Sequence, residues 1–405
     1  MSASKSGAAL SLRQSLDALA PWLAERSVQV DAEGNFPSEN MAALHRSGLL
    51  QVGLSLQRGG AGLGRETPFA DYFELVTGLA RACSNTAQLF TVQNGALYTL
   101  EQLASEALLD EIASAVQRQG ASFCFVGAEP DERFTHDNKR VNIKSVATPL
   151  PDGQWHITAE KAFATGSVGC QYALFQCATV TEDDGRPPES VLVVLPRHHS
   201  AVTIQDTWNG VGQRATASGR LHVAPSQVSA HWVVGNPASA PHGALFAPLY
   251  QLGFAAILAG IGEAALDDTL KFVHGTLKPT HGYQRPADEP AIQAHVGDIR
   301  IALSASRALI REAARSMDAY LRQETEIADV LVAVYQAKVH ASASSLEAGS
   351  RLFQVGGARS ATRDWAFDRH WRNARTLTLH DSVDKQKGIV ARHILGIERP
   401  NVSTR

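Results

Sequence analysis

The chain has 405 residues, of which 44% are hydrophobic and 19% are charged, and its formal net charge is -3. This composition excludes a disordered or fibrous protein. The small net charge gives no overall attraction to nucleic acid or to an anionic membrane. The length allows two or three domains, so we expect a multidomain globular protein that binds neither nucleic acid nor membrane.

The cysteines and the apolar runs indicate the compartment. Cys83, Cys124, Cys170 and Cys177 show neither a CxxC spacing nor a metal-ligand spacing with histidine. They predict free thiols, no metal site and a reducing compartment such as the cytoplasm. Residues 1–10 carry one charge, Lys5, and no long apolar core, and no run of about 18 apolar residues follows. We expect a cytoplasmic protein without a membrane span.

The N-terminal third has a helical pattern of apolar residues over 12–23, 41–50 and 69–100, which predicts an α-helical domain over residues 1–120. Within 69–100, Gln93, Asn94 and Tyr98 fall on one helix face. Two interpretations are open. The face is the ordinary polar side of a helix, or it lines a substrate pocket.

The middle of the chain changes character. Short alternating or β-branched segments at 155–158, 172–180, 190–195 and 220–223 are separated by Pro and Gly. They predict a β-sandwich or barrel domain over 121–235. Long helical segments joined by short links then predict an antiparallel four-helix bundle over 236–405. The expected fold class is therefore α+β with three domains.

Two motifs in the β-domain carry candidate binding residues. The first, Gly153 to Gly166, places Phe163 and Thr165 two residues apart, on the same side of a strand. Such a pair can stack on a flat ring and donate one hydrogen bond to it, or can be ordinary strand residues. The second, Trp208 to Gly219, contains Arg214, which forms either a structural ion pair or a cofactor contact.

Two further motifs lie in the C-terminal third. Gln354, Gly356 and Gly357 follow a long helix, where Gly favours a helix C-cap. The second motif runs from Arg372 to Asp381 and ends in Thr-Leu-His-Asp, with His380 and Asp381 adjacent.

Together these motifs resemble those of the acyl-CoA dehydrogenase superfamily. The Thr-Leu-His-Asp segment is similar to the corresponding segment in the flavin monooxygenase branch of this superfamily. That branch contains the dibenzothiophene monooxygenase and SfnB-like sulfur-acquisition proteins. The resemblance implies a flavin, FAD or FMN, and a homotetramer or homodimer that receives reduced flavin from a separate reductase. It assigns catalytic roles to His380, Asp381 and Thr165. The implied cofactor contacts are Phe163, Thr165, Arg214, Gln354, Gly356 and Gly357, and the implied substrate contacts are Gln93, Asn94 and Tyr98.

The carboxylates near the implied flavin separate the possible reactions. An acyl-CoA dehydrogenase needs a positioned base to remove a weakly acidic proton, and the family uses Glu. This chain has no Glu between Glu347 and Glu398, and no Asp or Glu between Asp206 and Glu263.

Three functions stay open. The main prediction is a two-component monooxygenase that uses reduced flavin and O2 on a small sulfur- or nitrogen-containing compound. In it His380 moves protons near neutral pH. The alternatives are an acyl-CoA dehydrogenase with Asp381 as a shortened base, and a non-catalytic flavin-binding member of the superfamily.

Overall fold

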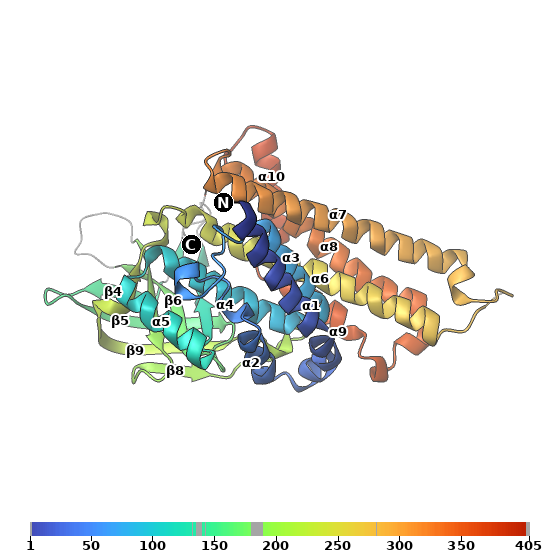
Figure 1. Cartoon of the computed structure of the whole chain (residues 1–405), viewed down its shortest axis with the longest axis horizontal. Helices are drawn as coiled ribbons and strands as arrows, with labels where there is room; N and C mark the ends of the chain where they lie inside the picture. The colour runs from blue at the N-terminus through green and yellow to red at the C-terminus, as the bar shows by residue number, and fades with distance from the viewer. Residues whose placement is uncertain are drawn as a thin grey trace.

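The computed structural model describes residues 2–401 apart from 132, 135–139, 142, 180–188 and 281. A helical N-terminal part, a β-sheet and a group of long C-terminal helices follow one another along the chain (Figure 1). The N-terminal helices are α1 (Ser2–Glu33), α2 (Ser38–Arg46), α3 (Phe69–Ala82), α4 (Ser84–Leu103) and α5 (Glu106–Gln119). The predicted helix pair over 69–100 corresponds to α3 and α4, which separate at Cys83 because its backbone is extended.

The middle of the chain forms one curled sheet of eight strands. Its order is β10-β7-β6-β4-β5-β9-β8, with β1 parallel to β6, while β2 and β3 form a separate two-stranded pair. The strands are β1 (Phe123–Val126), β2 (Arg133–Phe134), β3 (Arg140–Val141), β4 (Val146–Pro149), β5 (Gln154–Ala164), β6 (Tyr172–Thr179), β7 (Ser190–Pro196), β8 (Val202–Gln205), β9 (Gly219–Ser229) and β10 (Val233–Gly235). Val180, the end of one predicted strand, lies outside the described residues.

Three long helices extend away from the sheet side by side (Figure 1). They are α6 (Phe246–Gly275), α7 (Pro290–Leu321) and α8 (Ile327–Ser360), and two short helices, α9 (Asp368–Thr378) and α10 (Val383–Ile394), complete the group. The segment Gly243–Gly275 is long and apolar enough to cross a membrane, but 83% of its apolar window is buried inside the protein. We therefore interpret α6 as the core helix of this domain.

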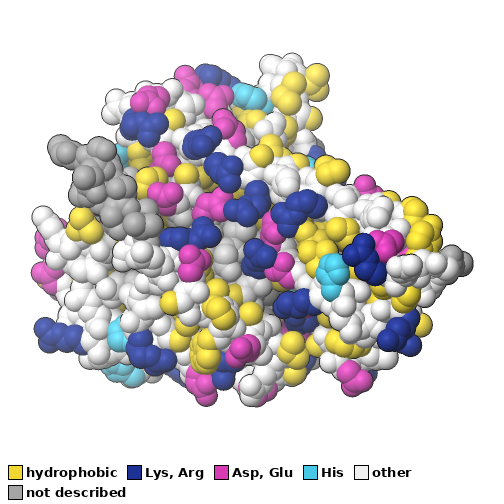
Figure 2. Space-filling view, turned by 45° about the vertical axis from the view of Figure 1, so that its right-hand side comes forward, with side chains coloured by type: hydrophobic (Ala, Val, Ile, Leu, Met, Phe, Trp, Pro, Cys, Tyr) yellow, Lys and Arg dark blue, Asp and Glu magenta, His cyan; other side chains and the backbone are white. Residues whose placement is uncertain are grey.

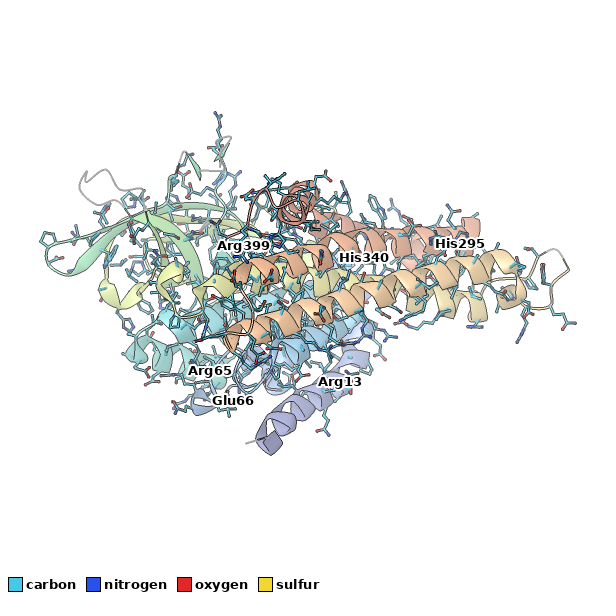
Figure 3. All side chains as sticks on the ribbon, turned by 90° about the horizontal axis from the view of Figure 1, so that it is seen from above. Arg13, Arg65, Glu66, His295, His340 and Arg399 are labelled. Carbon is cyan, nitrogen blue, oxygen red and sulfur yellow. The ribbon has the colours of Figure 1, made fainter. Side chains whose placement is uncertain are left out.

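A polar seam joins α7 to α8, and its histidines His295 and His340 lie along these helices in Figure 3. Ser306, which interrupts the apolar face of α7, bonds Nδ1 of His340 at 2.8 Å and the hydroxyl of Ser344 at 2.7 Å. Further along, His295 contacts the guanidinium of Arg351 at 2.8 Å. These histidines thus hold two helices together.

Charged side chains of both signs are interspersed on the face shown in Figure 2. This mixture matches the small net charge of the chain. A surface of this kind does not concentrate the positive potential that attracts a nucleic-acid backbone.

A buried ion pair joins β5 to the loop that follows β1. Nζ of Lys161 lies 3.1 Å from Oε1 of Glu129, and both side chains are almost fully buried. Lys161 also donates to the carbonyl of Gly127, and Glu129 accepts the backbone N–H groups of Lys144 and Ser145. Burial alone would raise the pKa of Glu129, but the Lys144 N–H group and the Lys161 charge outweigh it and lower that pKa.

We expect Glu129→Ala to lower the free energy of unfolding by about 3–5 kcal/mol, because it removes a buried carboxylate that compensates the charge of the buried Lys161 ammonium. Urea denaturation followed by circular dichroism measures this loss. The double variant Glu129→Leu/Lys161→Met should recover much of it.

Lys144→Ala is the matched control for this prediction. The Lys144 ammonium pairs with Asp131 and Glu160 at the surface, so its removal should cost about 1 kcal/mol or less. A cost for Glu129→Ala no larger than that of Lys144→Ala would contradict the structural role of the pair.

Candidate active site

The Thr-Leu-His-Asp segment forms the turn between α9 and α10. His380 is exposed, and its ring lies 3.9 Å from the ring of Phe254 on α6, centre to centre. Asp381 has different partners: its Oδ2 accepts from the side-chain amides of Gln386 at 3.1 Å and Gln251 at 3.4 Å. Its Oδ1 accepts the backbone N–H group of Ser382 at 3.0 Å. The two adjacent residues therefore have different surroundings.

An aromatic face connects this turn to the β-domain. Phe246, Tyr250 and Phe254 follow one another at four-residue intervals along α6, so they share a helix face. Phe125 of β1 stacks on Tyr250 at 5.1 Å and meets Phe246 edge-on at 5.2 Å. Phe125 also forms a backbone bridge with Thr165. The aromatic contacts thus connect α6, whose Phe254 lies against His380, with the strand β1 that pairs with Thr165.

Phe163 is an unusual exposed aromatic residue at the end of β5. Its side chain is 67% exposed, its backbone has a φ of 59°, and it contacts Trp208 edge-on. An exposed ring held by a strained backbone and a neighbouring indole is a platform on which a flat ring can stack. The residues present therefore fit the isoalloxazine ring of a flavin.

Thr165 is 9% exposed and lies in a hydrogen-bonded network. Its hydroxyl lies 3.0 Å from the hydroxyl of Ser218, and it accepts from the amide of Gln88 at 3.4 Å. Gln88 in turn accepts from Gln213 at 2.8 Å. The network fixes the position of the hydroxyl.

The turn over residues 208–219 docks onto α9. The N–H groups of Gly212 and Gln213 donate to the side chains of Thr376 at 2.9 Å and Asn373 at 2.5 Å. A Cβ atom on Gly212 would collide with the carbonyl oxygen of Arg372, so only glycine permits this approach. The motif that begins at Arg372 therefore joins the helical domain to the β-domain.

The same turn places Arg214 against the N-terminal helices. Its half-buried guanidinium packs beside Gly34, directly after α1. This position gives Arg214 a packing role between the turn and the N-terminal helices.

An ion cluster fixes the start of α9 on α6. Asp268 accepts from Arg369 at 2.6 Å and from His370 at 2.8 Å. Burial opposes the charge of Asp268, but the His370 hydrogen bond and the Arg369 charge lower its pKa to about 2. The carboxylate thus holds α9, and with it the turn that carries His380.

The polar face on α4 is buried. Gln93 and Asn94 are 0% exposed. The amide of Gln93 bonds the backbone of Leu50, Ala121 and Phe123. The amide of Asn94 bonds Leu49, Gly53 and Phe90.

Tyr98, the third predicted substrate contact, is also buried and meets Phe69 edge-on at 5.6 Å. Gln93 and Asn94 thus join α4 to neighbouring backbone of the N-terminal part and of β1. Tyr98 also lines a small pocket together with Phe246, so its predicted substrate contact stays a prediction.

The predicted Gln-x-Gly-Gly turn lies at the far end of α8. Gly357 has φ 58° and ψ -156°, which breaks the helix there, and Gln354 is exposed. Gly356 packs near Phe272, which is 18 residues beyond Phe254 on α6. At 1.5 Å per residue this separates the turn from His380 by about 27 Å.

Reasoning from the sequence missed Gln251, Phe254 and Lys338. Lys338 on α8 is 0% exposed and donates to Oε1 of Gln251 at 2.6 Å. The aromatic spacing along α6 was one available signal. A glutamine and a lysine inside otherwise apolar helices were the others.

Comparisons with known proteins indicate the family of the chain. The chain is 29% identical over 394 residues to the "Probable FMNH2-dependent monooxygenase SfnC" of Pseudomonas putida, with 94% of each protein covered. It is 28% identical over 401 residues to the dibenzothiophene monooxygenase of Rhodococcus qingshengii, covering 95% of this chain and 94% of the relative. The crystal structure of TdsC from Paenibacillus sp. A11-2 with FMN and indole superposes with a TM-score of 0.87 at 25% identity, covering 97% and 98% of the two chains.

Two family descriptions match in addition. "Acyl-CoA dehydrogenase, N-terminal domain" covers residues 12–117, and "Acyl-CoA dehydrogenase, C-terminal domain" covers residues 252–385. Together they span more than half of the chain. These findings confirm the predicted fold class and the resemblance to the monooxygenase branch. The chain belongs to the acyl-CoA dehydrogenase superfamily of flavin-dependent oxidoreductases.

Proposed function

We propose that this protein is the oxygenase component of a two-component flavin-dependent monooxygenase. In the balanced reaction, one oxygen atom of O2 enters the substrate and the other leaves as water, while reduced flavin supplies two electrons and two protons. The bound flavin supplies the oxygen activation. Phe163 would stack on its ring, Thr165 would donate a hydrogen bond to its edge, and His380 would move protons beside it.

The environment of Asp381 is the observation that carries this proposal. A base must approach the proton it removes, yet three N–H donors hold the Asp381 carboxylate against Gln251, Gln386 and its own turn. The exposed group beside it is His380, and an imidazole can both accept and donate a proton. This arrangement suits proton transfer in oxygen chemistry better than removal of an α-proton.

The aromatic face and the relatives suggest the substrate. The half-buried rings of Phe246 and Phe125 contact each other, and the backbone of Phe125 pairs with Thr165. The relatives are named for dibenzothiophene oxidation and for FMNH2-dependent oxygenation. We therefore propose a small organosulfur or nitrogen compound, with reduced FMN delivered by a separate reductase.

The location and assembly follow from other features. The four cysteines are buried free thiols, which supports a cytoplasmic location. The turn at Gln354, Gly356 and Gly357 is too far from His380 to contact the same flavin ring. We propose that it contacts the cofactor of a neighbouring subunit in a homotetramer or homodimer.

Sedimentation velocity at micromolar protein should show a species of at least two subunits. The exposed Ile394, Leu395 and Ile397 at the C-terminal end offer apolar surface for such contacts. A single monomeric species with full activity would contradict the proposed sharing of cofactor contacts.

Two assays together test the reaction class. Without oxygen, a panel of acyl-CoAs should leave the absorbance of the bound oxidised flavin unchanged. With O2, a reductase and FMN, a panel of thioethers, sulfoxides and sulfinates should yield a product that carries one atom from 18O2. Bleaching of the flavin by an acyl-CoA would instead identify a dehydrogenase with Asp381 as its base.

We expect His380→Asn to lower the rate of product formation about 10²–10⁴-fold, because it removes the proton-transfer group. Reduced-flavin binding, measured by anaerobic fluorescence titration, should change little. His222→Asn is the control, since His222 is exposed on β9. Equal rates for the two variants would exclude His380 from the chemistry.

A further inference from the structure

A fully buried lysine lies beneath the turn that carries His380 and Asp381. Lys338 projects from α8 and none of its surface is exposed. Lysine is rarely buried completely, because removing an ammonium group from water costs several kcal/mol unless partners compensate. We therefore expect specific partners to compensate the charge of Lys338.

The first connection runs through Gln251 to Asp381. Nζ of Lys338 donates to Oε1 of Gln251 at 2.6 Å, and Nε2 of Gln251 donates to Oδ2 of Asp381 at 3.4 Å. An ammonium can only donate and a carboxylate can only accept. These two ends fix the orientation of the amide between them.

Gln386 closes this network. Its Nε2 donates both to Oε1 of Gln251 and to Oδ2 of Asp381, each at 3.1 Å. Gln386 is 0% exposed, so the network is shielded from water on this side. A low-dielectric setting strengthens each of its charged hydrogen bonds.

The second connection runs through Phe254 to His380. Nζ of Lys338 lies 5.7 Å from the centre of the Phe254 ring, within the range of a cation–π contact. The same ring carries the imidazole of His380 at 3.9 Å. Gln251 and Phe254 are three residues apart and lie on one face of α6. The buried ammonium of Lys338 is thus linked to Asp381 through Gln251 and to His380 through Phe254.

We infer that Lys338 is a positioning residue for the proposed monooxygenase site. Its ammonium fixes Gln251 and Phe254, which hold the Asp381 carboxylate and the His380 ring in one arrangement. This role rests on the proposed function of the site. It adds a residue that is remote in the sequence and contacts neither flavin nor substrate.

The test compares Lys338→Met, which keeps most of the length of the side chain without the charge, with wild type. We expect the share of reduced FMN that ends in oxygenated product to fall at least tenfold, with the remaining electrons released as hydrogen peroxide. The dissociation constant of reduced FMN and the KM for the sulfur substrate should change less than twofold. Lys387→Met removes an exposed charge on α10 and should match wild type.

Lys338→Gln is the second variant in case Lys338→Met does not fold. Glutamine both donates and accepts, so it no longer fixes the direction of Gln251, and the same loss of product is expected. Product yields equal to wild type in whichever variant folds would overturn the inference.

A cycle of single and double variants, Lys338→Met and Asp381→Asn, separates this inference from the proposed function. Its readout is urea unfolding, which needs no activity. We expect the unfolding equilibrium constant of the double variant to differ at least fivefold from the value that additive single effects would give. Additive effects would overturn the positioning role. Absence of oxygenation by the wild type would overturn the proposed function alone.

Discussion

The site depends on the close approach between the turn over 208–219 and α9. Phe163 and Thr165 belong to the β-domain, whereas His380 follows a helix of the C-terminal domain, so neither half is complete alone. Gly212 allows the backbones to meet, and Asn373 supplies the hydrogen bond that sets their register. Arg372 extends the junction to the N-terminal part through an ion pair with Asp31 at 2.6 Å. A single short helix therefore joins all three parts of the molecule.

Local patterns in the sequence predicted the architecture well. Alternation and helical periodicity depend on neighbours in the chain, which is why segments of β5, β6, β7 and β9 and the long helices after 246 were predicted. The strand pairing was beyond reach, because β1 pairs with β6 across almost fifty residues. The sequence left a sandwich or a barrel open, and the structure has one curled sheet.

Prediction of the site was less complete, for a physical reason. A polar residue on an apolar helix looks the same whether it faces a ligand or a backbone group. Gln93 and Asn94 turned out to bond backbone groups that strands and loops leave unpaired. Conversely, Gln251 and Lys338 lie 87 residues apart, and only packing of α6 against α8 brings them together. His380 and Phe163 were recognisable because their motifs are contiguous.

The same network explains how a dehydrogenase-like fold can favour another reaction. A carboxylate that removes a proton must be free to approach its substrate. Here Asp381 is shorter than Glu, and its carboxylate accepts hydrogen bonds from Gln251 and Gln386. Lys338 in turn orients Gln251. These contacts hold the carboxylate on Gln251, while the imidazole of His380 lies against Phe254 one turn further along α6. The proposed function therefore rests on these buried polar contacts as well as on the loss of one carboxylate.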